Sequence, residues 1–172
     1  MKTKKMTQVA LMSAVICILS PLTLPIGPVP VTLGTLAVLF SAYLLGAKYG
    51  TLSYLLYYLL GCFGLPVFSG FQGGISKALG PTGGFLIGFF ALCAISGFFI
   101  EKYTKNYIRF LGMLLGETVC YLIGVIWYAV VAHTTLLQAF LTACAPFIAV
   151  DILKMLIVIL VGNEIKKRIV LQ

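Results

Sequence analysis

Charge is scarce in this 172-residue chain. Charged residues make up 9% of the sequence, and only four of them are Asp or Glu. A soluble domain carries about 25% charge. Hydrophobic residues account for 61% of the sequence, and many of them lie in uncharged apolar runs. The length of these runs approaches the roughly 20 residues that a membrane-spanning helix needs. These features predict an all-α integral membrane protein whose spans leave no room for a separate catalytic or nucleotide-binding domain.

Residue patterns typical of enzymes are also missing. The chain has one histidine, His133, and neither an HExxH nor a GxSxG motif. Its five cysteines are dispersed and form no CxxC pair, which argues against a zinc site. The glycine-rich stretch that ends at Lys77 lacks the spacing of an ATP-binding P-loop. We therefore predict no catalytic residues, no metal and no bound cofactor.

The apolar runs divide the chain into six predicted spans within a single transmembrane domain, residues 1–172. Their approximate bounds are 6–20, 32–47, 50–63, 84–101, 109–131 and 143–165. With six spans, ten of the twelve basic residues share one side of the membrane: Lys2, Lys4, Lys5, Lys48, Lys102, Lys105, Arg109, Lys166, Lys167 and Arg168. The positive-inside rule then predicts cytoplasmic termini in a cell membrane. This topology explains the net charge of +8 without nucleic acid as a partner.

Two long connections then face outward. Residues 20–31 are uncharged and contain four prolines, Pro21, Pro25, Pro28 and Pro30, and residues 64–84 are rich in glycine. A long connection between otherwise short turns is usually functional. Packing or capping of the bundle is the alternative.

The last predicted span contains an acid and a base, Asp151 and Lys154, three residues apart and therefore on one helix face. If the helix begins at Ala143, they lie roughly 12 and 16 Å from its outer end. Ionisable groups inside a membrane are costly and usually mark function. We predict a ligand site here, although a purely structural ion pair is the alternative.

Three further features of the spans carry no decisive motif. Glu117 is a second membrane acid, suited to pairing with Lys154, to proton coupling, to a partner contact or to a structural role. Tyr121 is a candidate wall of the ligand pocket. Ala10 and Ala14 form a small-xxx-small pair, which lets another helix approach closely in lipid.

These segments together resemble the BioY family, the biotin-specific substrate-binding (S) components of energy-coupling-factor (ECF) transporters. The resemblance covers nearly the whole chain. It is carried by Gly-Leu-Pro-Val-Phe at 64–68, Gly-Pro-Thr-Gly-Gly-Phe at 80–85, the segment from Pro146 to Lys154, and Pro-Val-Pro-Val-Thr-Leu at 28–33. Two positions depart from the family pattern. Gly34 stands where glutamine is usual, and Val150 stands where glycine is usual.

The resemblance implies a six-helix S component that captures biotin outside a bacterial cell. It also implies partners: a transmembrane coupling protein of the EcfT type and two cytoplasmic EcfA-type ATPases, which use the ATP. On this basis Ala10 and Ala14 are predicted to dock on the coupling protein. The predicted ligand-binding residues are Asp151, Lys154, Gln72, Gly73, Gly74, Thr82, Tyr121 and Phe68.

Other functions remain open from the residues alone. They are an S component for riboflavin or thiamine, a stand-alone facilitator, and a membrane acyltransferase using His133 and Asp151.

Overall fold

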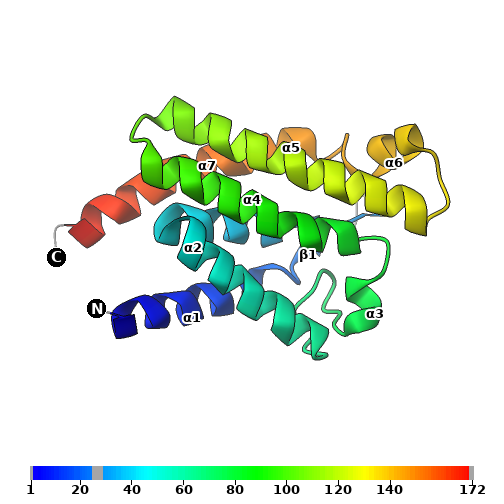
Figure 1. Ribbon diagram of the computed structural model, residues 1–172, viewed down its shortest axis with the longest axis horizontal. Helices are drawn as coiled ribbons and strands as arrows, with labels where there is room; N and C mark the ends of the chain where they lie inside the picture. Colours follow the sequence, from blue (N-terminus) through cyan, green and yellow to red (C-terminus); the bar gives the residue numbers. More distant parts are fainter. Residues whose placement is uncertain (1, 25–28, 171–172) are drawn as a thin grey trace.

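The computed structural model describes residues 2–24 and 29–170, and it is an elongated bundle of helices (Figure 1). The predicted all-α class is confirmed. Pro25 and Pro28 of the first predicted connection lie outside the described residues. The helices are α1 Lys2–Leu19, α2 Gly34–Cys62, α3 Ile75–Ala78, α4 Gly83–Lys102, α5 Asn106–Val131, α6 Leu136–Ala143 and α7 Ile148–Val170. Between α1 and α2, two short strands, β1 Thr23–Leu24 and β2 Val31–Thr32, pair antiparallel.

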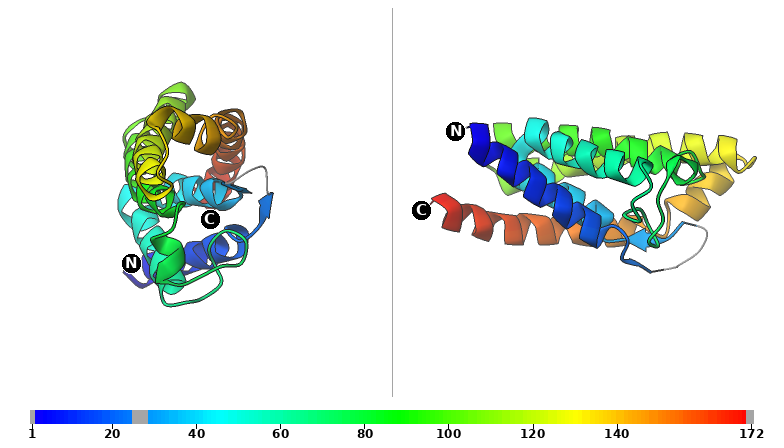
Figure 2. Two further views of the ribbon diagram at one scale, coloured as in Figure 1. Left: turned by 90° about the vertical axis from the view of Figure 1, so that its right-hand side faces the viewer. Right: turned by 90° about the horizontal axis from the view of Figure 1, so that it is seen from below.

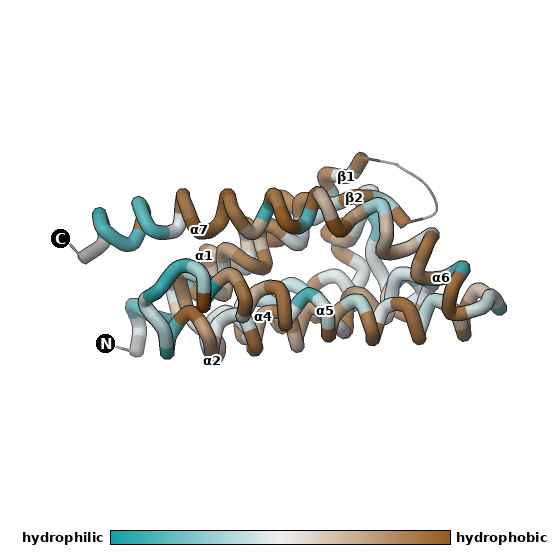
Figure 3. The backbone as a smooth tube through the Cα atoms, turned by 90° about the horizontal axis from the view of Figure 1, so that it is seen from above, coloured by the Kyte–Doolittle hydropathy of each residue, from teal (hydrophilic) through white to brown (hydrophobic). Residues whose placement is uncertain are grey.

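Long apolar helices dominate the described part of the chain, as expected for a multi-pass membrane protein. Helices α2, α4 and α5 are each long and apolar enough to cross a membrane, and α6 with α7 is a fourth candidate if that bent pair counts as one span. Figure 3 shows hydrophobic colour along the lengths of the helices and hydrophilic colour concentrated near the two termini. Composition therefore separates a polar end of the bundle from its apolar shaft.

Helix α2 is broken at Gly46, which has φ 77° and ψ −172°. The two halves of α2 fold back on each other there, since the Ser41 hydroxyl donates to the carbonyl of Gly50 at 3.4 Å. A side chain at position 46 would be strained, and its Cβ would collide with the Glu101 carboxyl. The sequence places this break at residues 48–49, two residues too late, because glycine rather than the charged Lys48 makes the turn.

The last predicted span, 143–165, is wrong at its outer end. A short helix, α6, occupies residues predicted to be a loop, and it is capped by the Thr135 hydroxyl, which accepts from the Gln138 N–H at 3.3 Å. The chain then bends by 50° before α7 begins at Ile148. Pro146 lies in this break, where its missing N–H and its restriction of the preceding residue oppose a continuous helix. The depths inferred for Asp151 and Lys154 are therefore not valid.

Helix α4 is the centre of the bundle, packed between α2 and α5. Tyr54 of α2 is fully buried there, where its ring meets Phe89 and Phe90 edge-on and its hydroxyl donates to the carbonyl of Leu86 at 2.7 Å. Helices α1 and α7 also pack against α2. The aromatic core thus holds the second half of α2 to α4.

Both termini lie at the same end of the bundle, and α3, α6 and the β1–β2 hairpin lie at the opposite end (Figures 1 and 2). A polar cluster ties the helices together at the terminal end. There the Tyr43 hydroxyl donates to Asn163 Oδ1 at 2.6 Å, and the Arg109 guanidinium donates to the Tyr43 oxygen at 3.0 Å. The cluster joins α2, α5 and α7. It therefore anchors α7 at the end of that helix that lies far from Asp151.

A close approach of two helix backbones, α4 to α2, predicts a sensitive position. A Cβ at Gly97 of α4 would lie 2.4 Å from the backbone nitrogen of Ala47, and overpacking of this kind costs about 1–3 kcal/mol. We expect Gly97→Ala to lower the thermal midpoint in detergent, measured with a thiol-reactive dye that reports exposure of the buried Cys93 and Cys120. Gly80→Ala is the matched control, because its Cβ would meet nothing closer than 3.3 Å. Equal midpoints for the two variants would contradict the close packing.

Candidate ligand-binding site

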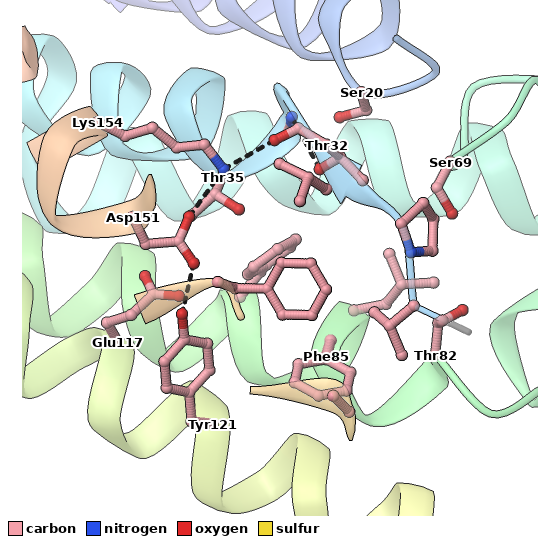
Figure 4. Close-up of a pocket in the computed structure, with 18 of the residues that line it drawn as sticks. Ser20, Thr32, Thr35, Ser69, Thr82, Phe85, Glu117, Tyr121, Asp151 and Lys154 are labelled. Carbon is pink, nitrogen blue, oxygen red and sulfur yellow. Dashed lines mark hydrogen bonds and ion pairs between the residues drawn. The ribbon is translucent and has the colours of Figure 1, made fainter. Parts of the chain in front are cut away.

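A pocket lies at the end of the bundle away from the termini, where the β1–β2 hairpin meets α2, α4, α5 and α7 (Figure 4). Its wall combines aromatic and aliphatic side chains with a few polar groups. The residues that form it are Ser20, Val29, Pro30, Val31, Thr32, Gly34, Thr35, Tyr57, Ser69, Thr82, Phe85, Leu86, Phe89, Glu117, Tyr121, Ala143, Phe147, Asp151 and Lys154. An apolar wall with few, convergent polar groups is typical of a small-molecule site.

A buried ion pair forms the polar end of this pocket. Lys154 Nζ lies 2.7 Å from Asp151 Oδ1, and the two residues are only 6% and 5% exposed. The second oxygen of Asp151 accepts a short hydrogen bond from the Tyr121 hydroxyl. Lys154 also donates to the carbonyl of Thr32 at 2.9 Å. Side chains of α5 and α7 are thereby joined to the strand β2.

Glu117 lies beside this cluster, one helical turn before Tyr121 on α5 (Figure 4). Glu117 is 3% exposed, and its Oε2 has no hydrogen-bond partner among the described residues. Burial of a carboxyl oxygen without a partner is costly. Glu117 is therefore the one acid of the pocket that is left with an open acceptor.

The pocket is narrow. Its volume is about 80 Å³, below the roughly 300–1,000 Å³ of typical ligand sites. A larger groove of about 510 Å³ lies between α5, α6 and α7 and reaches Glu117, Tyr121 and Asp151 from the other side. The groove is otherwise mostly apolar, with exposed side chains such as Leu122 and Phe140. A ligand larger than a few atoms must therefore push the pocket walls apart.

Four of the eight predicted ligand residues line the pocket: Asp151, Lys154, Tyr121 and Thr82. The other four do not. Phe68 is fully buried against Gly61 and Tyr57 in the core, and Gln72 is exposed. The backbone of Gly73 packs on the carbonyl of Leu65, and the Gly74 N–H donates to the carbonyl of Gly61 at 2.7 Å. The glycines of this connection thus serve its own folding in this structure.

Comparisons with known proteins identify the family. The family model described as the BioY family matches residues 1–170. The chain belongs to the BioY family. A probable biotin transporter BioY of Pyrococcus horikoshii is 38% identical over 166 residues, covering 96% of this chain and 98% of the relative. The biotin transporter BioY of Thermotoga maritima is 34% identical over 165 residues, covering 95% and 96%.

A solved structure shares the fold. It is the crystal structure of the S-component for biotin from an ECF-type ABC transporter, with a TM-score of 0.89 and 32% identity, and the match covers 96% of this chain and 92% of that one. The predicted S-component architecture is therefore confirmed at the level of the bundle. The fold and the BioY assignment agree over nearly the whole length.

Several residues that line the pocket were not among those predicted from the sequence. Phe85 and Phe147 provide aromatic walls, and Thr32 provides the carbonyl for Lys154. Phe85, Phe147 and Thr32 all lie within segments that resemble BioY sequences, so the motifs contained the signal. Trp127 of α5 donates from its indole N–H to the carbonyl of Gly80 at 3.0 Å and so joins α5 to the connection before α4.

The two departures from the usual BioY pattern have different settings. Gly34 lines the pocket, and a Cβ there would lie 2.8 Å from the Ser20 hydroxyl oxygen. A larger side chain at that position therefore needs the wall to shift. Val150 packs instead against the apolar cluster of Val31 and Phe147, outside the pocket wall.

The ion pair predicts a contrast in stability. Asp151→Leu leaves the Lys154 charge buried without its partner, and breaking a buried pair in this way costs about 3–5 kcal/mol. We expect a large fall in the thermal midpoint in detergent without added ligand, and substantial recovery in the double variant Asp151→Leu/Lys154→Met. Glu164–Lys167 is the matched control, a pair of the same spacing at 2.8 Å whose side chains are 63% and 69% exposed. Glu164→Ala is expected to leave the midpoint unchanged because water screens that pair. Equal effects at the two pairs would contradict the buried geometry.

Proposed function

We propose that this protein captures biotin and hands it to an ECF-type ABC transporter for uptake, and that it is not itself an enzyme. One observation supports the proposal above all: a buried acid–base pair at the polar end of an apolar pocket, in a chain of the BioY family. Biotin offers two ureido N–H donors, one carbonyl acceptor and an apolar bicyclic body. Asp151 and Lys154 suit the ureido group, and Phe85 and Phe147 suit the rings.

The proposed topology has six spans, with Gly46 as the turn between the second and third spans and both termini in the cytoplasm. Two facts support it. The ends of the chain lie together (Figure 2), and the connections that carry the basic clusters lie at the same end. Anionic lipid and the positive-inside bias favour this end on the cytoplasmic side of a cell membrane. The ligand pocket would then open outward, and the chain would form one transmembrane domain.

The proposed partners are a transmembrane coupling protein and two cytoplasmic ATPases, which would supply the ATP-driven step. Helix α1 is suited to docking because Ala10 and Ala14 are both exposed along with Leu11 and Ile18. A lipid-facing stripe of small residues permits a close approach by another helix.

The alternatives differ in what supports them. An S component for riboflavin or thiamine would share this fold, and a stand-alone facilitator would need no partner. The acyltransferase has the least support, because His133 is exposed in the turn after α5 and does not line the pocket that contains Asp151.

Titration of the purified protein in detergent with biotin, riboflavin and thiamine tests the proposed ligand. We expect biotin to bind with a dissociation constant below about 1 µM, equivalent to roughly −8 kcal/mol, and the other two vitamins not to compete. Asp151→Asn should weaken the binding of biotin by about tenfold or more, because the substitution replaces a charged hydrogen-bond acceptor by a neutral amide. Absence of submicromolar biotin binding would overturn the assignment.

Substitution on α1 tests the docking role. Ala10→Phe and Ala14→Phe are expected to leave biotin affinity unchanged and to reduce ATP-driven biotin uptake strongly in cells that express the coupling components. Leu122→Phe is the control, since Leu122 is 59% exposed on α5, and its uptake should match the wild type. Loss of biotin binding in the α1 variants would mean that this face supports the pocket instead.

A further inference from the structure

Glu117 has a place in the pocket that the ion pair does not explain. Glu117 is almost fully buried and lines the pocket together with Asp151 and Lys154. Its Oε2 lacks a hydrogen-bond partner among the described residues. Buried polar atoms in native proteins are nearly always hydrogen-bonded, so such an oxygen calls for a donor from outside the chain.

The other acid is already engaged on both sides. Asp151 Oδ1 accepts from Lys154, and Oδ2 accepts from the Tyr121 hydroxyl. Any ligand donor that approaches Asp151 must share an oxygen with one of these two bonds. Glu117, which lies beside Asp151 in Figure 4, offers an acceptor with no such competitor.

The base of the pair is only partly engaged. An ammonium group has three N–H donors, and Lys154 directs one to Asp151 and one to the carbonyl of Thr32. One N–H therefore remains for a ligand acceptor. The polar end of the pocket thus presents a free acceptor on α5 and a free donor on α7. A cyclic urea has complementary groups, with N–H donors on either side of a carbonyl oxygen.

We propose that Glu117 accepts a hydrogen bond from a ureido N–H of the ligand and so determines the preference for a cyclic urea, while the remaining Lys154 N–H donates to the ureido carbonyl. This inference rests on the proposed capture of biotin. It makes Glu117 a specificity-determining residue that acts beside Asp151 and Lys154, with Asp151 sharing its oxygens between the ligand and its bonds to Lys154 and Tyr121.

The test pairs variants of Glu117 with changes in the ligand. Affinities of the purified full chain are measured for biotin, for desthiobiotin, which keeps the ureido ring, and for a biotin methylated on a ureido nitrogen, with both regioisomers tried. In Glu117→Leu we expect the binding of biotin and of desthiobiotin to weaken by the same factor, about tenfold for the loss of one buried hydrogen bond. One of the two methylated isomers should bind the wild type much more weakly than biotin does. We expect that isomer and biotin to bind Glu117→Leu with equal affinity.

Matched variants separate this role from folding. Glu117→Gln keeps the shape and one acceptor oxygen, and we expect it to fall between wild type and Glu117→Leu. This variant carries the test if the leucine variant does not fold. Thr118→Val is the control, because Thr118 is exposed and its hydroxyl donates to the carbonyl of Leu114 at 2.8 Å. Its affinity for biotin should stay within about twofold of the wild type, a change of less than half a kcal/mol.

Each outcome distinguishes the two proposals. If the wild type binds no biotin, the proposed function fails. If the wild type binds biotin and both Glu117 variants bind it equally well, this inference fails, and water satisfies the Glu117 carboxyl. The methylated isomer could instead bind Glu117→Leu more weakly than biotin by the same factor as it binds the wild type. Steric exclusion, rather than the Glu117 hydrogen bond, would then account for the selectivity, and the inference again fails.

Discussion

The bond from Lys154 to Asp151, buried at 2.7 Å, is the interaction on which the site depends. Two charges withdrawn from water repay their desolvation only when the geometry is good and further hydrogen bonds satisfy them. Tyr121 and the Thr32 carbonyl supply those bonds. Because these partners come from α5 and β2, the pair holds three separate parts of the chain around one small space.

The helices that surround the pair are set by contacts of small residues. Gly97 allows α4 to meet the turn at Gly46, and Gly88 and Gly84 allow α4 to meet Cys120 and Trp127 of α5. Side chains pack in lipid by close approach rather than by exclusion of water. The close packing on one side contrasts with the groove between α5, α6 and α7, so the pocket is closely packed toward α4 and bordered by free space toward α6 and α7.

A narrow pocket suits the proposed capture role. Its free volume is about 80 Å³, so binding of a ligand as large as biotin would be accompanied by movement of the wall. The hairpin between α1 and α2 and the break between α6 and α7 both border the pocket. Helix α7 is meanwhile tied at its other end by Asn163 to Tyr43.

Composition and local pattern determined the class of this protein, since long uncharged apolar runs are costly in water and favourable in a lipid bilayer. The spacing of Asp151 and Lys154 also determined that they share a face, because helix geometry is local. Only the tertiary structure decided which residues meet them. Thr32 lies 122 residues from Lys154, and no local pattern reveals that contact. The turn at Gly46 and the bend before α7 likewise depend on what packs against them. Gln72, Gly73 and Gly74, predicted from the family resemblance to bind ligand, lie outside the pocket wall. The two glycines give no local signal either way, because glycine permits both ligand contact and simple turns.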